Sequence, residues 1–242
     1  AASDVYKRQM GRYGGREVNF SSDADVIIIY RPAEGADDDQ ANLFARKVQE
    51  DLRAILQGPT TFEPKIELDM DLRPEGKNGP LVRSYASCEE YYRSWASTWE
   101  HQALLRARYA AGDASLAEDF LMNIADPLRY PKIDLTETQI AEIRKLKARM
   151  EAERLPRGVR RDRHLKLGKG GLSDVEWTIQ LLQLQHAGDN ANLRVNGTLQ
   201  ALNELEHRKL ISAGDAVVLR KAWRMCCLLY TSPSPRDRSV SR

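Results

Sequence analysis

Two carboxylates spaced two residues apart, Asp23 and Asp25, stand at the start of an apolar run and could bind a cation together. Residues 26–30 (VIIIY) are rich in the β-branched types that strands favour. Side chains in a strand alternate between its faces, so these two carboxylates would project from the same face. A divalent cation relieves the repulsion between them. The stretch 23–30 therefore predicts a strand that begins with a metal-binding pair.

A third carboxylate comes from the stretch 64–72 (PKIELDMDL), in which apolar and polar residues alternate strictly. This pattern is typical of a half-buried strand, with Glu67, Asp69 and Asp71 in a row on its polar face. Adjacent acids on one face destabilise each other unless a cation is present. We therefore favour metal binding over a merely solvated face.

The pair Gly14-Gly15 precedes Asp23 by eight residues and could bring backbone N–H groups close to a phosphate. A glycine pair, an Asp-x-Asp pair and a buried strand in this order resemble the nucleotidyltransferase signature of the polymerase-β-like fold. The resemblance implies transfer of a nucleotide with divalent metal ions.

Three further blocks, 69–82 (DMDLRPEGKNGPLV), 99–108 (WEHQALLRAR) and 170–176 (GGLSDVE), resemble the glutamine synthetase adenylyltransferase family. Its members are bifunctional enzymes that adenylylate and deadenylylate glutamine synthetase, and the resemblance runs from about Met10 to Met225. It maps the third carboxylate onto Asp69, whereas Asp71 falls where many members carry a basic residue. The nucleotide-binding residues that it implies are Gly14, Gly15, Ser22 and Arg73.

The resemblance also implies a reaction, the transfer of AMP from ATP to a tyrosine hydroxyl of glutamine synthetase with release of pyrophosphate. Asp23, Asp25 and Asp69 would hold Mg²⁺ or Mn²⁺. A free tyrosine has a pKa of about 10, so its phenol is a poor nucleophile at neutral pH. The metals and Asp69 would promote loss of the phenol proton during attack on the α-phosphorus.

The family's enzymes contain two such halves, and this chain resembles one of them. Blocks 99–108 and 170–176 are more similar to the C-terminal, adenylylating half, so adenylylation leads and phosphorolytic deadenylylation is the alternative. A non-catalytic module that binds glutamine synthetase or the PII signalling protein is a second alternative, disfavoured by the retention of all three carboxylates. A third is an RNA nucleotidyltransferase.

Composition and charge are those of a globular protein with no dedicated nucleic-acid surface. Of 242 residues, 42% are apolar, and no apolar run approaches the roughly 20 residues needed to span a membrane. No signal peptide is visible, which predicts a cytoplasmic setting. Without residues 1–9 and 226–242 the chain has 32 basic and 33 acidic residues, and this balance disfavours nucleic acid as a partner. Cys88 is then the single cysteine, so neither a disulfide framework nor a zinc site is expected.

The predicted architecture is α+β, with a mixed sheet and flanking helices over residues 10–130 and a helical bundle over 131–225. Residues 1–9 (AASDVYKRQ) and 226–242 show no periodicity and resemble translated sequencing-adapter sequence joined to a truncated reading frame. We interpret both as non-native ends, and deleting them is predicted to change the melting temperature little.

Helix signals complete the picture. An amphipathic pattern predicts a helix over 41–56 with an apolar stripe from Phe44 to Leu56. Capping-box pairs predict helix starts at three places, and the first of these helices is expected to run unbroken through Leu105. The pairs are Ser87 with Glu90, Thr136 with Gln139, and Ser173 with Glu176. His101 is expected to be a hydrogen-bonded helix residue, and the roles of Asp174 and Glu176 in the catalytic cleft stay open.

Overall fold

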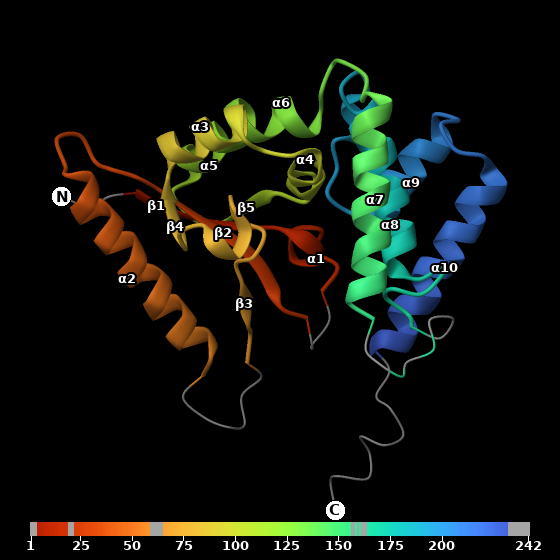
Figure 1. Cartoon of the computed structure of the whole chain (residues 1–242), viewed down its shortest axis with the longest axis horizontal. Coiled ribbons are helices and arrows are strands. Elements are labelled where there is room, and N and C mark those ends of the chain that lie inside the picture. Colours follow the sequence, from red (N-terminus) through yellow and green to blue (C-terminus); the bar gives the residue numbers. More distant parts are fainter. Residues whose placement is uncertain are drawn as a thin grey trace, which may run out of the picture.

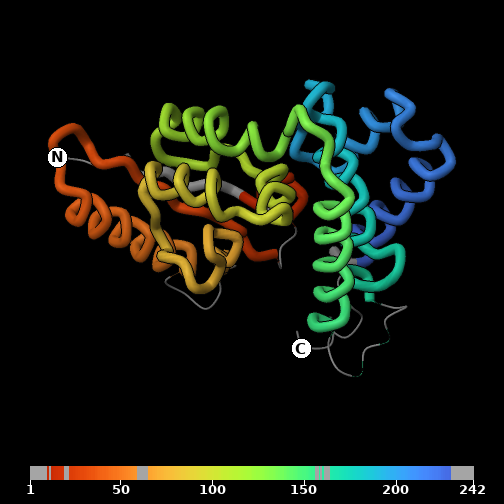
Figure 2. The backbone as a smooth tube through the Cα atoms, turned by 45° about the horizontal axis from the view of Figure 1, so that its top comes forward, coloured from red at the N-terminus to blue at the C-terminus, as the bar shows by residue number. Residues whose placement is uncertain are grey.

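The computed structural model describes residues 4–18, 22–58, 65–155, 158, 160 and 164–231. It has two parts, which Figure 1 shows side by side. The first, here called the sheet unit, is a β-sheet with helices on both faces and runs to about residue 130. The second, here called the bundle, is helical throughout and begins at residue 137. Helix α7 stands between the sheet unit and the other bundle helices in both Figure 1 and Figure 2.

The sheet is mixed, as the sequence predicted. Its described strands are β1 (Asp4–Gln9), β2 (Ala24–Arg31), β3 (Leu68–Asp69), β4 (Val82–Ser84) and β5 (Arg108–Gly112). The order is β3-β2-β1-β5, and β4 also pairs with β2. Strand β1 is antiparallel to β2 and β5, whereas β3 and β4 are parallel to β2.

Strand β2 is apolar throughout because both of its faces are covered. Ile27 and Ile29 pack into a cluster with residues of α3, α4 and α5, and Val26 and Ile28 pack against α2 on the other face. A strand buried on both sides carries a continuous apolar run instead of an alternating one. The helices of the sheet unit are α1 (Gly11–Gly14), α2 (Asp38–Leu56), α3 (Tyr85–Ser94), α4 (Thr98–Leu104), α5 (Ala114–Phe120) and α6 (Asp126–Arg129).

The bundle comprises α7 (Glu137–Glu153), α8 (Leu172–His186), α9 (Thr198–His207) and α10 (Ala213–Thr231). Its core is a separate cluster that includes Val175, Leu202 and Trp223. The predicted capping box of α7 is confirmed, since Thr136 and Gln139 each bond the other's backbone. This cluster also includes Leu105 of the sheet unit, and the division of the chain at about residue 130 stays a prediction. In the described residues no helix is both long and apolar enough to cross a membrane.

Residues 4–9 belong to the sheet, although the sequence suggested that they are a non-native end. They form β1, which lies between β2 and β5 and pairs with both. Residues 226–231 continue α10. The predicted architecture placed neither stretch in an element, whereas the structure places residues 4–9 in a strand and residues 226–231 in a helix. Strand pairing uses backbone groups and needs no periodic side chains. Residues 1–3 and 232–242 lie outside the described part, and the interpretation of either end as non-native stays a prediction.

Three local predictions also need correction. The helix predicted after Ser87 is two helices, with N-caps at Ser84 and Ser97, and Glu100 completes the second cap. Helix α2 packs through Ala41, Ala45 and Gln49, whereas Phe44 and Ile55 of the predicted stripe are exposed. Ala41 and Ala45 are small and allow α2 to approach the sheet closely. The larger side chains of Phe44 and Ile55 therefore lie on the exposed side of the helix.

The predicted strand over 64–72 is the third correction, because only Leu68 and Asp69 pair as β3. The backbone N–H of Asp71 donates to Asp69 Oδ1 at 2.7 Å, which turns the chain out of the strand. Residue 64 lies outside the described part.

Candidate active site

The predicted carboxylates come together where β2 and β3 run side by side. Asp25 of β2 and Asp69 of β3 are direct partners in the parallel register. Asp23 precedes β2 by one residue and shares the strand face of Asp25, because side chains alternate. Two strands from distant parts of the sequence therefore place three acids at one end of the sheet.

Electrostatics agrees with this placement. Burial, together with the neighbouring charges of Asp23 and Asp69, raises the pKa of Asp25 to about 7. Lys166, in the turn that precedes α8, opposes this shift of the Asp25 pKa. The acids are thus close enough to repel one another, and positive charge at this place stabilises their ionised forms. Sequence reasoning missed Lys166, whose only signal was its position in the basic stretch 157–169.

The donor set suits a hard cation, since it consists of carboxylate oxygens. In the part of the chain that the structure describes, no three or more Asp, Glu, His or Cys side chains are arranged to hold a metal ion. Mg²⁺ usually takes one or two protein carboxylates together with substrate phosphates and water. The arrangement therefore fits a cation that is completed by a nucleotide better than one held by protein ligands alone.

The structure places the guanidinium of Arg73 against the backbone of its own loop, and the nucleotide contact that the resemblance implied stays a prediction. Its side chain is buried, and its three guanidinium nitrogens donate to the carbonyls of Met70, Lys77 and Gly79 at 2.8 to 3.0 Å. All of these acceptors belong to the loop after β3. Arg73 therefore holds this loop in place.

Asp71 lies on the same loop and is half exposed. Its carboxylate pairs with Lys77 at 3.3 Å and lies 3.8 Å from Arg73 Nη1. Surface ion pairs of this kind contribute little to stability. Asp71 thus makes only weak contacts within its loop, whereas Asp69 belongs to the carboxylate group.

This difference gives a testable contrast. Replacing Asp69 by Asn is expected to lower AMP transfer by on the order of a hundredfold or more, because it removes charge beside Asp25. Replacing Asp71 by Asn should lower transfer less than about threefold, because only exposed ion pairs are lost. Initial rates of label transfer from ATP, measured at equal folded fractions, compare the two. A more damaging change at Asp71 would mean that the register of β3 is wrong.

The two glycines predicted to cradle phosphates lie in a buried turn at the end of α1. The carbonyl of Gly14 accepts from Arg108 Nε at 2.9 Å. A Cβ at Gly15 would overlap Arg106 Nη1, so a larger residue there would have to displace the buried Arg106 guanidinium. The closest approach at Gly15 is thus made by a protein side chain from the end of α4. Ser22 is half-buried and directly precedes Asp23.

The acids of block 170–176 divide between the two parts of the molecule. Helix α8 begins at Leu172 with Gly171 as its N-cap, so the predicted cap by Ser173 was wrong. Asp174 accepts from the N–H of Gly170 at 2.7 Å and pairs with Lys147 inside the bundle. Glu176 instead faces the sheet unit, where its Oε1 lies 3.8 Å from Arg12 Nε. Burial raises the pKa of the Glu176 carboxyl, and Arg106 and Arg12 counteract the rise.

His101 is half-buried in α4, and burial lowers its pKa while Glu142 of the bundle opposes the shift. It lies at the contact of α4 with the bundle, and no observation connects it with the carboxylates.

Two family models match successive parts of the chain. The model of glutamate-ammonia ligase adenylyltransferase matches residues 5–123, and that of PII-uridylyltransferase matches residues 141–229. The bifunctional glutamine synthetase adenylyltransferase/adenylyl-removing enzyme of Bifidobacterium longum (strain DJO10A) is 82% identical over 217 residues, which cover 90% of this chain and 20% of the relative. The enzyme of the same name from Streptomyces avermitilis is 50% identical over 88% of this chain and 21% of the relative.

The chain belongs to the glutamine synthetase adenylyltransferase family. It spans about a fifth of the length of the curated relatives that it matches. The family assignment agrees with the α+β architecture, in which the mixed sheet and its helices form a polymerase-β-like nucleotidyltransferase fold. The match to the second model falls on the bundle.

Proposed function

We propose that this chain is a nucleotidyltransferase unit that transfers AMP from ATP to a tyrosine hydroxyl of glutamine synthetase. The observation that carries the proposal is the register of Asp25 with Asp69, beside Asp23, in a chain of the adenylyltransferase family. ATP is a cellular metabolite, which fits the cytoplasmic setting predicted from the sequence.

The proposed reaction forms a bond between the phenolic oxygen and the α-phosphorus of ATP. The bond from the α-phosphorus to the oxygen that bridges the α- and β-phosphates breaks, and pyrophosphate leaves. Asp69 takes the phenol proton; its Oδ1 accepts the N–H of Asp71, so this bond helps to orient the carboxylate. Asp23, Asp25 and Asp69 would supply carboxylate oxygens to Mg²⁺ or Mn²⁺, whose coordination the phosphates of ATP would complete, and the metal would neutralise triphosphate charge and activate the phenol.

Met10, directly before α1, donates its backbone N–H to the carbonyl of Asp25 at 2.8 Å, and the loop that follows β3 begins next to Asp69. The glycine turn and this loop therefore lie near the acids. We assign the backbone of the turn to the β- and γ-phosphates. Lys166 joins this assignment as a cation near Asp25, contributed by the bundle. Arg73 acts indirectly, by holding its loop.

A phosphorolytic, deadenylylating reaction is the second candidate. It is favoured by the names of the relatives, which are both adenylyltransferase and adenylyl-removing enzymes. The same three acids would serve either direction. We favour adenylylation because blocks 99–108 and 170–176 are more similar to the adenylylating half of the family's enzymes. The match of the bundle to a PII-uridylyltransferase model supports the PII signalling protein as a regulatory partner.

One preparation can be assayed in both directions. With Mg²⁺ and α-labelled ATP, the chain is expected to label unmodified glutamine synthetase. With orthophosphate and adenylylated glutamine synthetase, it should release ADP at least about tenfold more slowly, because the proposal assigns it to the adenylylating half. The Asp25→Asn variant gives the background of each assay. Faster ADP release than labelling would reverse the proposed direction, and no activity in either direction would refute the catalytic proposal.

A further inference from the structure

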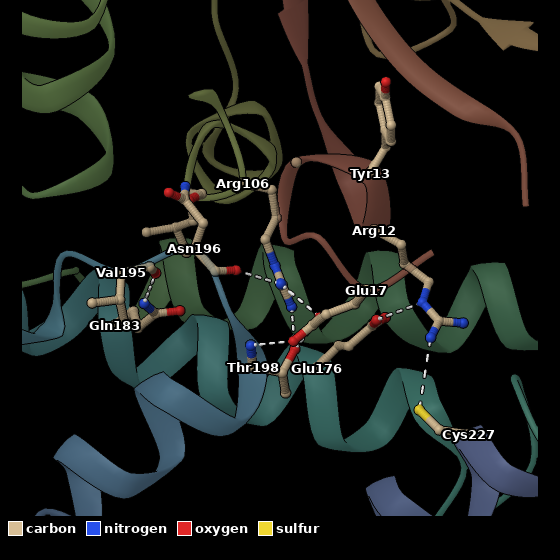
Figure 3. A network of polar contacts seen from close by, with 12 residues as sticks. Arg12, Tyr13, Glu17, Arg106, Glu176, Gln183, Val195, Asn196, Thr198 and Cys227 are labelled. Carbon is tan, nitrogen blue, oxygen red and sulfur yellow. Dashed lines mark hydrogen bonds and ion pairs between the residues drawn. The ribbon is translucent and has the colours of Figure 1, made fainter. Parts of the chain in front are cut away.

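A buried ionic cluster joins the glycine turn to the bundle. Glu17, three residues after Gly14, accepts from Arg106 Nη1 at 2.9 Å and from the hydroxyl of Thr198 at 2.8 Å. The same Thr198 hydroxyl accepts from Arg106 Nη2, and Arg106 Nη1 also donates to the carbonyl of Asn196. Figure 3 shows these groups converging between the turn, the end of α4 and the start of α9.

The buried charges of Arg106 and Glu17 have several hydrogen-bond partners in this cluster. The Arg106 side chain is 5% exposed and that of Glu17 is 16% exposed. Burial of an ion pair costs free energy unless further hydrogen bonds satisfy both groups. The contacts to Thr198 and Asn196 supply those bonds. Removal of one member therefore leaves the others buried without their partners.

Glu17 also caps a helix of the other part of the molecule. The N-cap position of α9 is Gly197, which has no side chain to accept a hydrogen bond. The Glu17 carboxylate accepts the backbone N–H of Thr198 in its place. A carboxylate at a helix N-terminus is stabilised by the free N–H groups and by the helix dipole. The position of α9 and the position of Glu17 are therefore coupled.

The coupling reaches the backbone of the turn. Arg106 Nη1 lies against Gly15 so closely that a Cβ there would overlap it. Arg108, two residues further on, donates to the carbonyl of Gly14. The turn is thus held between two arginines, and one of them is itself held by α9.

We propose that Glu17, Arg106 and Thr198 are positioning residues, through which the bundle holds the Gly14–Gly15 turn in the form that binds the triphosphate of ATP. This inference rests on the proposed function, because it takes the turn as the phosphate site. None of the three residues needs to touch ATP. They act by fixing the backbone of the turn, in which the N–H groups of Gly14 and Arg16 donate to the carbonyls of Met10 and Tyr13.

The chain offers a matched pair of variants for a test. Thr198→Val removes one hydroxyl from the cluster with almost no change in volume. Thr98→Val makes the same change at another buried threonine that opens a helix, where the hydroxyl donates to Glu142 of α7 at 2.9 Å. Both bonds connect the sheet unit with the bundle, but the contacts of Thr98 do not include the turn.

Two measurements on the 242-residue chain decide the inference. Thr198→Val is expected to raise the Kd for Mg²⁺-ATP about tenfold, the effect of losing one charge-assisted hydrogen bond. It should also speed amide exchange over residues 11–18. Thr98→Val should leave both quantities near those of the wild type, and Thr198→Ser, which keeps the hydroxyl, should restore most of the affinity.

Equal effects of the two valine variants, or no rescue by serine, would overturn the positioning role, because loss of packing would then explain the result. Unchanged amide exchange in Thr198→Val would overturn it as well. If the wild type binds no ATP, the proposed function fails. The exchange measurement still decides in that case whether the cluster holds the turn.

Discussion

Replacement of Asp25 by asparagine is expected to lower AMP transfer by roughly two to three orders of magnitude while the chain stays folded. Asp25 stands in register with Asp69 and feels the charges of Asp23 and Asp69. Asparagine keeps the shape but removes the negative charge that a cation needs. The measurement is the initial rate of label transfer from ATP to glutamine synthetase. A rate near that of the wild type would refute the metal-binding role of Asp25.

The same substitution should stabilise the protein at higher pH. Because the pKa of Asp25 is raised to about 7 in the folded state, its ionisation there is unfavourable. Its contribution to stability is present below the unfolded pKa and is lost as the pH rises through about 7. The melting temperature of Asp25→Asn relative to wild type should therefore increase between about pH 4 and about pH 8. Asp71→Asn, at a half-exposed surface position, is the control for the general effect of removing one carboxylate.

The parts of the site that are local in sequence could be predicted. The strand of residues 24–31 follows from its β-branched run, and the shared face of Asp23 and Asp25 follows from strand geometry. Asp69 was found because alternation and family resemblance agreed at that position. Parallel pairing of β2 with β3 then brings Asp25 and Asp69 together.

Contacts between distant residues could not be predicted. Arg73 stands in a loop rich in glycine and proline, and nothing in this pattern shows that loop carbonyls use all of its nitrogens. Thr198 is 181 residues from Glu17, and their bond depends on how the bundle packs. Gly15 was predicted to allow close approach of a phosphate, and the group that lies against it in the structure is Arg106. A local sequence pattern can indicate that a residue makes a close contact, but it does not identify the distant residue that makes the contact.

The position of strand β1 inside the sheet reverses the sequence-based prediction that residues 1–9 are dispensable. Deletion of residues 1–9 is now expected to destabilise the sheet unit by on the order of several kcal/mol. The strand pairs with β2 on one side and with β5 on the other, from Asp4 to Gln9. Without it, backbone N–H and C=O groups of both neighbours lose their partners, and β5 loses its connection to the sheet.

The denaturation midpoint of the shortened chain measures this effect, with deletion of residues 232–242 as the control. The control should leave the midpoint nearly unchanged, because it removes no residue of β1–β5 or α1–α10. A large fall for the first deletion alone would establish that residues 4–9 supply a strand that this fold requires, whatever their origin. Equal and small shifts for both deletions would instead restore the prediction that residues 1–9 are dispensable, and would mean that β2 and β5 are stable without a strand between them.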